Sequence, residues 1–199
     1  DDAAVDLVRN EPARDGKPKP SHALCDGIHG GQGSRRIANG RGRARQITLE
    51  MWKNLHENFP KFNVLNLGFG GAFIESLDKY FETLFQFNSP KAIVMYMGGN
   101  DLSLDYNANQ IFQMIKALIF RIHKKFPTSR IINIGIKPSF ERQKDLKTIK
   151  QINCMMRELS NTIPYLNQVD LFNELMVDEK IDKKYFLQDG LHLNKQGYI

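Results

Sequence analysis

The sequence has few cysteines, few tryptophans and no long apolar run. Its two cysteines, Cys25 and Cys154, lie far apart among 199 residues, which does not fit a disulfide framework. No stretch is apolar over the length of a membrane span. The chain as written shows no signal peptide at its start, so its compartment stays open. This length and composition predict one globular domain with a sizeable core.

Acidic residues are missing from one stretch, which accounts for most of the net charge of +6. Five arginines stand there without an acid among them: Arg35, Arg36, Arg41, Arg43 and Arg45. Because the rest of the chain is nearly neutral, the charge does not indicate a nucleic-acid-binding protein. The stretch also lacks aromatic residues for base stacking, so we expect a solvated arm and no nucleic-acid partner. An arginine-rich binding arm is the alternative, and it would bind with a steep dependence on salt.

Residues 1–46 lack hydrophobic periodicity. They are rich in Gly, Arg, Pro, Ala and Asp, and such a segment cannot bury enough apolar surface to order itself. We expect an irregular arm there, disordered or non-native, followed by one domain over residues 47–199. His22, Cys25 and His29 have spacings that a metal could use. Zinc sites need a stable scaffold, however, so we expect no metal.

From Ile47 onward, strand and helix patterns alternate. Short apolar runs predict strands at 62–68, 91–99, 130–136 and 167–173. Apolar residues at helical spacing predict helices along 49–56, 74–84, 111–126 and 146–160. On the last of these helices we expect Asn153 to form a buried hydrogen bond. The alternation predicts an α/β fold with a parallel sheet, whose chemistry lies at the carboxyl ends of the strands.

A glycine-rich loop, NLGFGGA (66–72), follows the first of these predicted strands. Its glycines allow backbone N–H groups to approach a ligand closely at the start of a helix. Gly68 and Gly70 fit the start of a dinucleotide-binding pattern, but Phe73 occupies the place of its third glycine. A nucleotide site is therefore weakly indicated, and a tight strand-to-helix turn explains the loop equally well.

Two further loops carry polar side chains. MGGND (97–101) follows the second predicted strand. Its Asn100 can point an amide at the sheet edge, or else Asn100 or Asp101 caps the next helix. Near the end of the chain, Asp189 and His192 stand three residues apart across an Asp-Gly turn. A carboxylate in that place can orient a histidine that acts as a general base. Taken alone, a D-x-x-H spacing is a common chance match, and a surface loop with a solvated histidine explains it as well.

Together and in this order, NLGFGG, GGND and DGLH resemble blocks II, III and V of the SGNH (GDSL-type) hydrolases, a family of esterases and lipases. The resemblance covers roughly residues 47–199. It implies a three-layer α/β/α, flavodoxin-like fold and hydrolysis of acyl esters through a serine acyl-enzyme, with no metal or organic cofactor. It also implies a small-molecule ester as substrate: an acetylated sugar, a short-chain ester or a lipid ester.

The resemblance assigns roles residue by residue. His192 would be the general base, and Asp189 would be its orienting carboxylate. The backbone N–H of Gly71 and the side-chain amide of Asn100 would be oxyanion donors. Such donors stabilise the negative charge that develops on the carbonyl oxygen during attack on an ester.

What the chain lacks is the serine. In the resembled family, a first strand ends in Gly-Asp-Ser or Gly-Ser-Ser, just before a helix that often carries a tryptophan. ITLEMW (47–52) is similar to the start of that helix, which places the nucleophile at Gln46, or at Ile47. Neither side chain can attack an ester. No apolar run precedes them either, so the first strand is missing or replaced.

Three explanations stay open. In the first, the residues up to Gln46 are not the native amino-acid sequence. In the second, the chain is an inactive binding module for a carbohydrate or ester ligand. In the third, another hydroxyl group replaces that of the serine. The nearest substitute is Thr48, Ser34 lies in the irregular arm, and Ser139 follows a predicted strand but fits a turn. The chain also stops at Ile199, where the family fold continues a helix, so we expect the domain to be truncated there.

Overall fold

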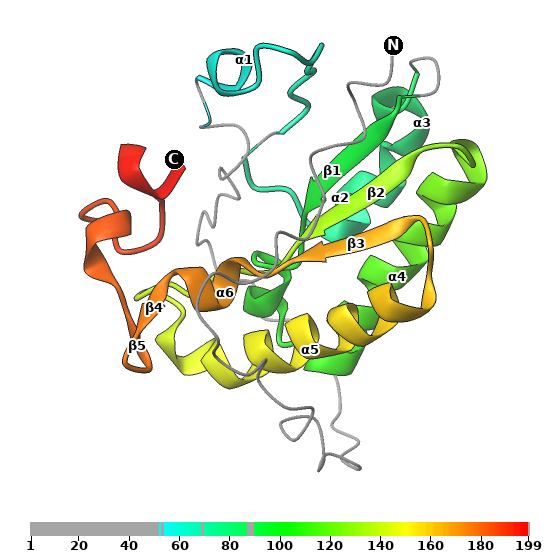
Figure 1. Ribbon diagram of the computed structural model, residues 1–199. Helices are drawn as coiled ribbons and strands as arrows, with labels where there is room; N and C mark the ends of the chain where they lie inside the picture. Colours follow the sequence, from blue (N-terminus) through cyan, green and yellow to red (C-terminus); the bar gives the residue numbers. More distant parts are fainter. Residues whose placement is uncertain (1–51, 53, 69, 87–89, 199) are drawn as a thin grey trace.

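The computed structural model describes residues 52, 54–68, 70–86 and 90–198 (Figure 1). Its helices are α1 (Leu55–Asn58), α2 (Ile74–Lys79), α3 (Phe81–Leu84), α4 (Ala108–Lys125), α5 (Leu146–Thr162) and α6 (Leu171–Glu174). Its strands are β1 (Ala92–Tyr96), β2 (Arg130–Ile134), β3 (Leu166–Val169), β4 (Met176–Val177) and β5 (Lys180–Ile181). Short 3-10 helices are η3 (Asp101–Leu104), η4 (Gln143–Asp145), η5 (Lys183–Tyr185) and η6 (Lys195–Tyr198). Among these described residues, no helix is both long and apolar enough to cross a membrane.

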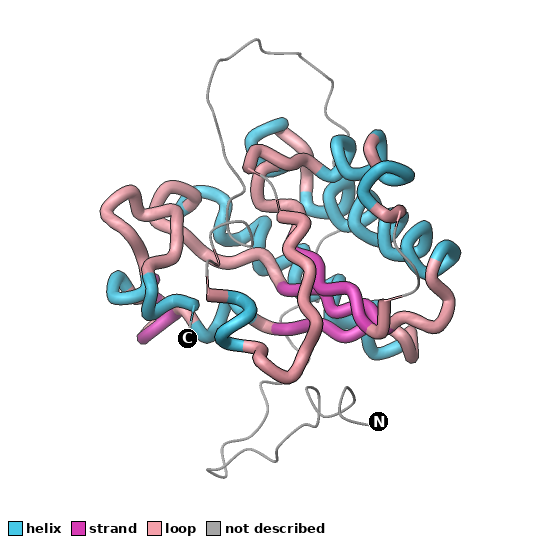
Figure 2. Tube along the Cα trace, turned by 90° about the horizontal axis from the view of Figure 1, so that it is seen from above, coloured by secondary structure: helices cyan, strands magenta, loops and turns pink. Residues whose placement is uncertain are grey.

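Strands β1, β2 and β3 form a parallel sheet in that order, and β4 and β5 form a separate antiparallel pair. Helix α4 connects β1 to β2, and α5 connects β2 to β3, because parallel neighbours need a long crossover. Figure 2 shows the three strands together near the middle of the molecule, with helices and loops around them. The predicted α/β fold with a parallel sheet is confirmed.

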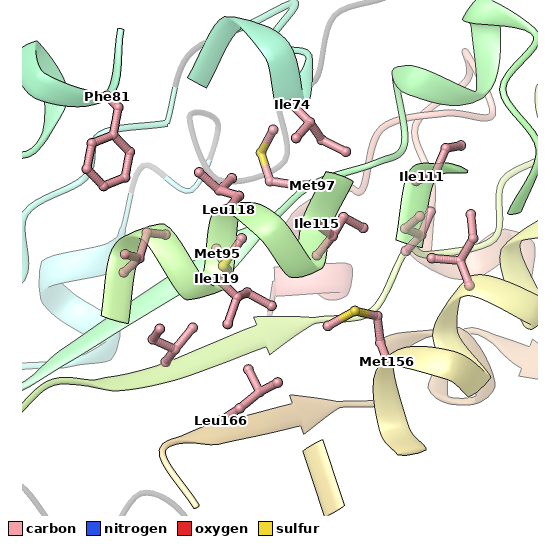
Figure 3. Close-up of a cluster of buried hydrophobic side chains, with 14 of the residues drawn as sticks. Ile74, Phe81, Met95, Met97, Ile111, Ile115, Leu118, Ile119, Met156 and Leu166 are labelled. Carbon is pink, nitrogen blue, oxygen red and sulfur yellow. The ribbon is translucent and has the colours of Figure 1, made fainter. Parts of the chain in front are cut away.

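The core lies between the sheet and the helices α2, α4 and α5. Helix α4 begins with a capping box, in which the side chains of Asn107 and Gln110 each accept the backbone N–H of the other residue. Its buried face follows the predicted spacing: Ile111, Ile115, Leu118, Ile119 and Ile122. Figure 3 shows this face of α4 beside Met95 of β1, Leu166 of β3 and Met156 of α5. Burial of this apolar surface is what holds the helices on the sheet.

The strand predicted at 62–68 is wrong. These residues adopt no regular structure, and Leu65 and Leu67 are 68% and 41% exposed. An apolar run becomes a strand only where a neighbouring strand supplies hydrogen-bond partners. Among the described residues β1 pairs only with β2, so this run has no partner in the sheet.

The strand predicted at 167–173 is shorter than expected. It ends at Val169, because the carboxylate of Asp170 accepts the N–H groups of Phe172 and Asn173 and so begins α6. The predicted apolar run therefore covers both a strand and the first turns of a helix. In Figure 1, α6 lies just beyond the end of β3.

Candidate active site

His192 and Asp189 are hydrogen-bonded to each other on one loop. His192 Nδ1 lies 2.5 Å from Asp189 Oδ2, and the two side chains are 17% and 47% exposed. The other carboxylate oxygen, Oδ1, accepts the backbone N–H groups of Leu191 and His192, each at 3.0 Å. One carboxylate therefore fixes both the turn and the imidazole ring.

The ionisation of Asp189 determines which ring nitrogen carries a proton. Desolvation by burial raises the pKa of Asp189, but hydrogen bonds from the backbone and ring of His192 and from the Leu191 N–H outweigh it and lower the pKa to about 2. An ionised carboxylate can only accept hydrogen bonds, so Nδ1 of His192 is the donor. In the neutral ring this leaves Nε2 as the proton acceptor, which a general base requires.

Backbone bonds close the loop that carries this pair. Phe186 and Leu193 form an antiparallel bridge, and the Leu187 N–H donates to the His192 carbonyl at 2.8 Å. The Asn194 side chain adds a further bond, because its Nδ2 donates to the Phe186 carbonyl at 3.2 Å. The position of His192 is thus defined by both ends of the loop.

Asn100 is buried, and its side chain reaches the glycine-rich loop. It is 4% exposed, and its Nδ2 donates to the Ala72 carbonyl at 2.9 Å. It stands at the start of η3, but its side chain forms no capping bond there. The bond to Ala72 uses one of the two N–H groups of the amide. Gly71, whose φ is 76°, directly precedes Ala72, so the two predicted oxyanion donors lie on segments that are bonded to each other.

Asp101 follows Asn100 and is completely buried. Its Oδ1 accepts the N–H of Ile74, the first residue of α2, at 3.1 Å, and its Oδ2 has no hydrogen-bond partner among the described residues. Desolvation by burial raises the pKa of Asp101 to about 6. The Ile74 N–H and the positive charge of Arg142 act in the opposite direction, whereas Glu75 adds to the increase.

The folded-state pKa of Asp101 lies above its ordinary value of 3.8, so the folded state binds the proton more tightly than the unfolded state does. The protonated Asp101 therefore contributes its full stability below pH 3.8, and this contribution is lost as pH rises through about 6. Asp101→Asn keeps an oxygen for Ile74 and removes the charge. We expect the variant to be more stable than the parent above pH 6, by roughly 3 kcal/mol at most. The two should converge toward pH 4. Urea unfolding across this pH range measures the difference, and equal stability of both proteins at every pH would contradict the assignment.

The end of β2 connects the Asn100 loop to the His192 loop. Gly98 packs closely on Ile136, since a Cβ at Gly98 would lie 2.8 Å from Ile136 Cδ1. Lys137 comes next, and its Nζ donates to the carbonyl of Leu191, the neighbour of His192, at 2.5 Å. Both loops are therefore attached to the same short segment at the carboxyl edge of the sheet.

Two other polar residues of this region have structural contacts. Ser139 is 1% exposed, and its Oγ accepts the N–H of Arg142 at 3.3 Å, as a turn residue does. Asn153 forms the buried hydrogen bond expected of it, which is confirmed: its Oδ1 accepts from Ile136 N and its Nδ2 donates to Ile136 O, both at 2.8 Å. The hydroxyl of Ser139 therefore takes part in a local turn.

The predicted positions of the nucleophile lie outside the described residues. This holds for Gln46 and Ile47 and for the substitutes Thr48 and Ser34. It also holds for the histidines and cysteine of the weak metal pattern, His22, Cys25 and His29. In the part of the chain that the structure does describe, no group of three or more His, Cys, Asp or Glu side chains could hold a metal ion.

The sequence pattern indicated Asp101 only as a candidate helix cap, and it gave Lys137 no role. Both are charged residues in the loops that follow apolar strands, at the sheet edge where functional residues are expected. That position is the signal that could have identified them, because a charged side chain there is buried only when it has a specific partner.

The chain is similar to a known protein family and to several curated proteins. The model of the GDSL-like Lipase/Acylhydrolase family matches residues 36–198. The alpha1 subunit of platelet-activating factor acetylhydrolase IB from Rattus norvegicus is 25% identical over 151 residues, which are 75% of this chain and 63% of that protein. The chain thus spans 63% of the length of the curated relatives it matches.

Solved structures show the same fold. A candidate platelet activating factor from Streptococcus pneumonia has a TM-score of 0.66 at 23% identity, covering 75% of this chain and 74% of its own. A family 3 carbohydrate esterase from Clostridium thermocellum has a TM-score of 0.50 at 24% identity, covering 64% of this chain and 59% of its own. With the family match over most of its length, the chain belongs to the GDSL-like lipase/acylhydrolase family.

Proposed function

We propose that this domain is an acyl-ester hydrolase whose site is formed by Gly71, Asn100, Asp189 and His192. The observation that carries the proposal is the bond between His192 Nδ1 and Asp189 Oδ2, which leaves Nε2 as a base. The buried amide of Asn100, bonded to the residue after Gly71, supports it. Membership of the family makes acyl transfer the reaction class that best fits these groups.

In the proposed reaction, a hydroxyl oxygen attacks the ester carbonyl and His192 Nε2 takes its proton. The C–O bond order falls, and the Gly71 N–H and the remaining amide N–H of Asn100 stabilise the oxyanion. Collapse of this intermediate breaks the bond to the alcohol, which leaves with the proton from His192. Water then attacks the acyl-enzyme with the help of the same base and releases the acid.

The chain has no serine at the position where the family pattern places the nucleophilic hydroxyl of this proposed reaction. Gln46 occupies the place where the family pattern has serine, and the sequence between Ser34 and Ser76 contains no serine. Without a serine, His192 can still activate a water molecule for direct attack beside the oxyanion donors, which is slower and forms no acyl-enzyme. We therefore expect the chain as it stands to hydrolyse esters slowly and without a burst.

The substrates of the relatives suggest a small acyl group. One relative is an acetylhydrolase and one structural neighbour is a carbohydrate esterase. We propose an acetyl ester as the substrate, with the alcohol part, sugar or lipid, left open. Acetate esters of 4-nitrophenol are a suitable probe, because they present the acyl group with a leaving group that is easily detected.

The test is a burst experiment with 4-nitrophenyl acetate. In the Gln46→Ser chain we expect a rapid release of nitrophenol equal to the enzyme concentration, followed by slower turnover, since an acyl-enzyme then accumulates. The unchanged chain should show no burst. Ile47→Ser serves as the second variant, because the family pattern can also be aligned one residue later. If neither serine produces a burst or faster turnover, and the unchanged chain does not hydrolyse the ester either, the hydrolase proposal fails.

The second candidate function is a binding module without turnover, which the absence of serine at position 46 favours. The same loops would then hold a carbohydrate or ester ligand. Calorimetric titration with an acetylated sugar separates the two functions. Binding by the unchanged chain, together with no hydrolysis by the Gln46→Ser chain, would support the binding module.

A further inference from the structure

We infer that Lys137 is a positioning residue that holds the His192 loop at the carboxyl edge of the sheet. The inference rests on the proposed function for the role of His192, but the contact itself involves neither the nucleophile nor substrate. Lys137 is 5% exposed, and its Nζ donates to the Leu191 carbonyl at 2.5 Å. A lysine is rarely buried to this extent unless its charge has a specific partner.

A second bond fixes the neighbouring residue of the same loop. The Phe140 N–H donates to the Gly190 carbonyl at 2.9 Å, and the Phe140 ring packs edge-on against Phe186 with 5.7 Å between centroids. Gly190 has a φ of 65°, and a Cβ there would lie 3.0 Å from Phe140 Cβ. The connection after β2 thus contacts the loop at two consecutive carbonyls, those of Gly190 and Leu191.

Lys137 is itself held by the fold. The preceding residue, Ile136, is bonded through both its N–H and its carbonyl to the buried side chain of Asn153 on α5. Hydrogen bonds therefore link α5 to Ile136 and link Lys137, the next residue in the chain, to Leu191, which is the neighbour of His192. A base must lie within hydrogen-bond reach of the proton it removes, so anchoring its loop affects the rate directly.

The charge of Lys137 makes this contact dependent on pH. Desolvation by burial, together with a smaller contribution from the positive charge of Arg142, lowers the pKa of Lys137 to about 8. Asp189 and Glu141 face it with negative charge and act in the opposite direction. Below pH 8 the ammonium group forms a charge-assisted bond, and above pH 8 the neutral amine forms a weaker one. We expect the loop to loosen, and hydrolysis to slow, as pH rises through about 8.

The first measurement uses the unchanged chain and needs no activity. The backbone amide resonances of Leu191 and His192 are followed by NMR as pH is raised. We expect both to shift with a midpoint near pH 8. In Lys137→Met, which keeps the apolar stem without the donor, this transition should be absent. Resonances that do not respond near pH 8 in the unchanged chain would overturn the inference, whatever the outcome of the hydrolysis assays.

The second measurement uses kinetics in the Gln46→Ser chain. Lys137→Met should lower kcat about 10- to 100-fold with little change in KM, and should remove the alkaline decline near pH 8. Lys137→Gln, which keeps a neutral N–H donor, should recover part of kcat but still lack the decline. Lys147→Met, at an exposed position on α5, is the matched control and should behave like the parent. A Lys137→Gln protein with an unchanged alkaline decline would contradict the role of Lys137.

The two measurements also separate this inference from the proposed function. If the NMR transition occurs but the Gln46→Ser chain does not hydrolyse esters, Lys137 holds the loop but the hydrolase proposal fails. If hydrolysis occurs and Lys137→Met leaves kcat and its pH profile unchanged, the hydrolase proposal stands and the positioning role is wrong.

Discussion

Replacement of His192 by alanine is expected to lower kcat/KM for 4-nitrophenyl acetate by about 10²–10⁴-fold in the Gln46→Ser chain. The reason is that the serine hydroxyl loses the group that accepts its proton. The Asp189 carboxylate, whose pKa is held at about 2, then has no ring to orient. Because the base acts in the transition state, the loss should fall on kcat rather than on KM.

His56→Ala is the matched control for this change. His56 is an exposed histidine on α1, and its removal should leave kcat/KM within about twofold of the parent. Unfolding of both variants by urea shows whether a loss of activity reflects a loss of folded protein. Full activity in a folded His192→Ala protein would remove His192 from the mechanism.

Replacement of Asn100 by alanine has the second largest expected effect, a decrease in kcat of about 10²–10³-fold. The change removes the amide that we propose as an oxyanion donor, which is held in place by its hydrogen bond to the Ala72 carbonyl. A donor of this kind needs no reorganisation when the charge develops, which is why its loss is costly. The burst in the Gln46→Ser chain should slow by the same factor, since acylation is the step that forms the first oxyanion.

Asn100→Ala also removes a structural hydrogen bond, so the control must do so as well. Asn133 on β2 is another buried asparagine, and its Nδ2 donates to Gln168 Oε1 at 2.7 Å. Asn133→Ala should lower the free energy of unfolding by about 1–3 kcal/mol and leave kcat nearly unchanged. If Asn100→Ala affects only stability, as this control does, Asn100 is not an oxyanion donor.

The periodic parts of the fold could be predicted from the sequence. The apolar face of α4 repeats over several turns, and the run around β1 is short, apolar and followed by two glycines, so local patterns are sufficient there. The loops to search also followed from the alternation of strands and helices, because the carboxyl ends of parallel strands share one edge. The Asp189–His192 pair needed only a local turn.

Other features depend on contacts between distant segments, which a local pattern does not contain. Whether the run at 62–68 forms a strand depends on a partner elsewhere in the sheet. Lys137 bonds to a carbonyl 54 residues later, and the Asn100 side chain bonds to a carbonyl 28 residues earlier. The burial of these two side chains follows from tertiary packing alone. The sequence pattern therefore indicated the loops in which they lie, but it did not indicate their hydrogen-bond partners.

The absence of serine at positions 46 and 47 has a simple physical consequence for the proposed site. An oriented histidine and an oxyanion donor can both persist without a nucleophile, because each has its own structural bonds, to Asp189 and to Ala72. Loss of the nucleophile therefore need not destabilise the rest of the site. This is why the base and the donors are tested separately from the hydroxyl, through variants that restore serine and variants that remove the other groups.

The most direct test of the account is a crystal structure of the Gln46→Ser chain after reaction with a 4-nitrophenyl phosphonate ester, which mimics the tetrahedral intermediate. The account predicts phosphorus bonded to the oxygen of Ser at position 46. One phosphonyl oxygen should lie about 2.7–3.1 Å from both Gly71 N and Asn100 Nδ2, with His192 Nε2 facing the serine oxygen. An adduct whose oxygens contact neither donor, or an imidazole directed away from it, would contradict the account.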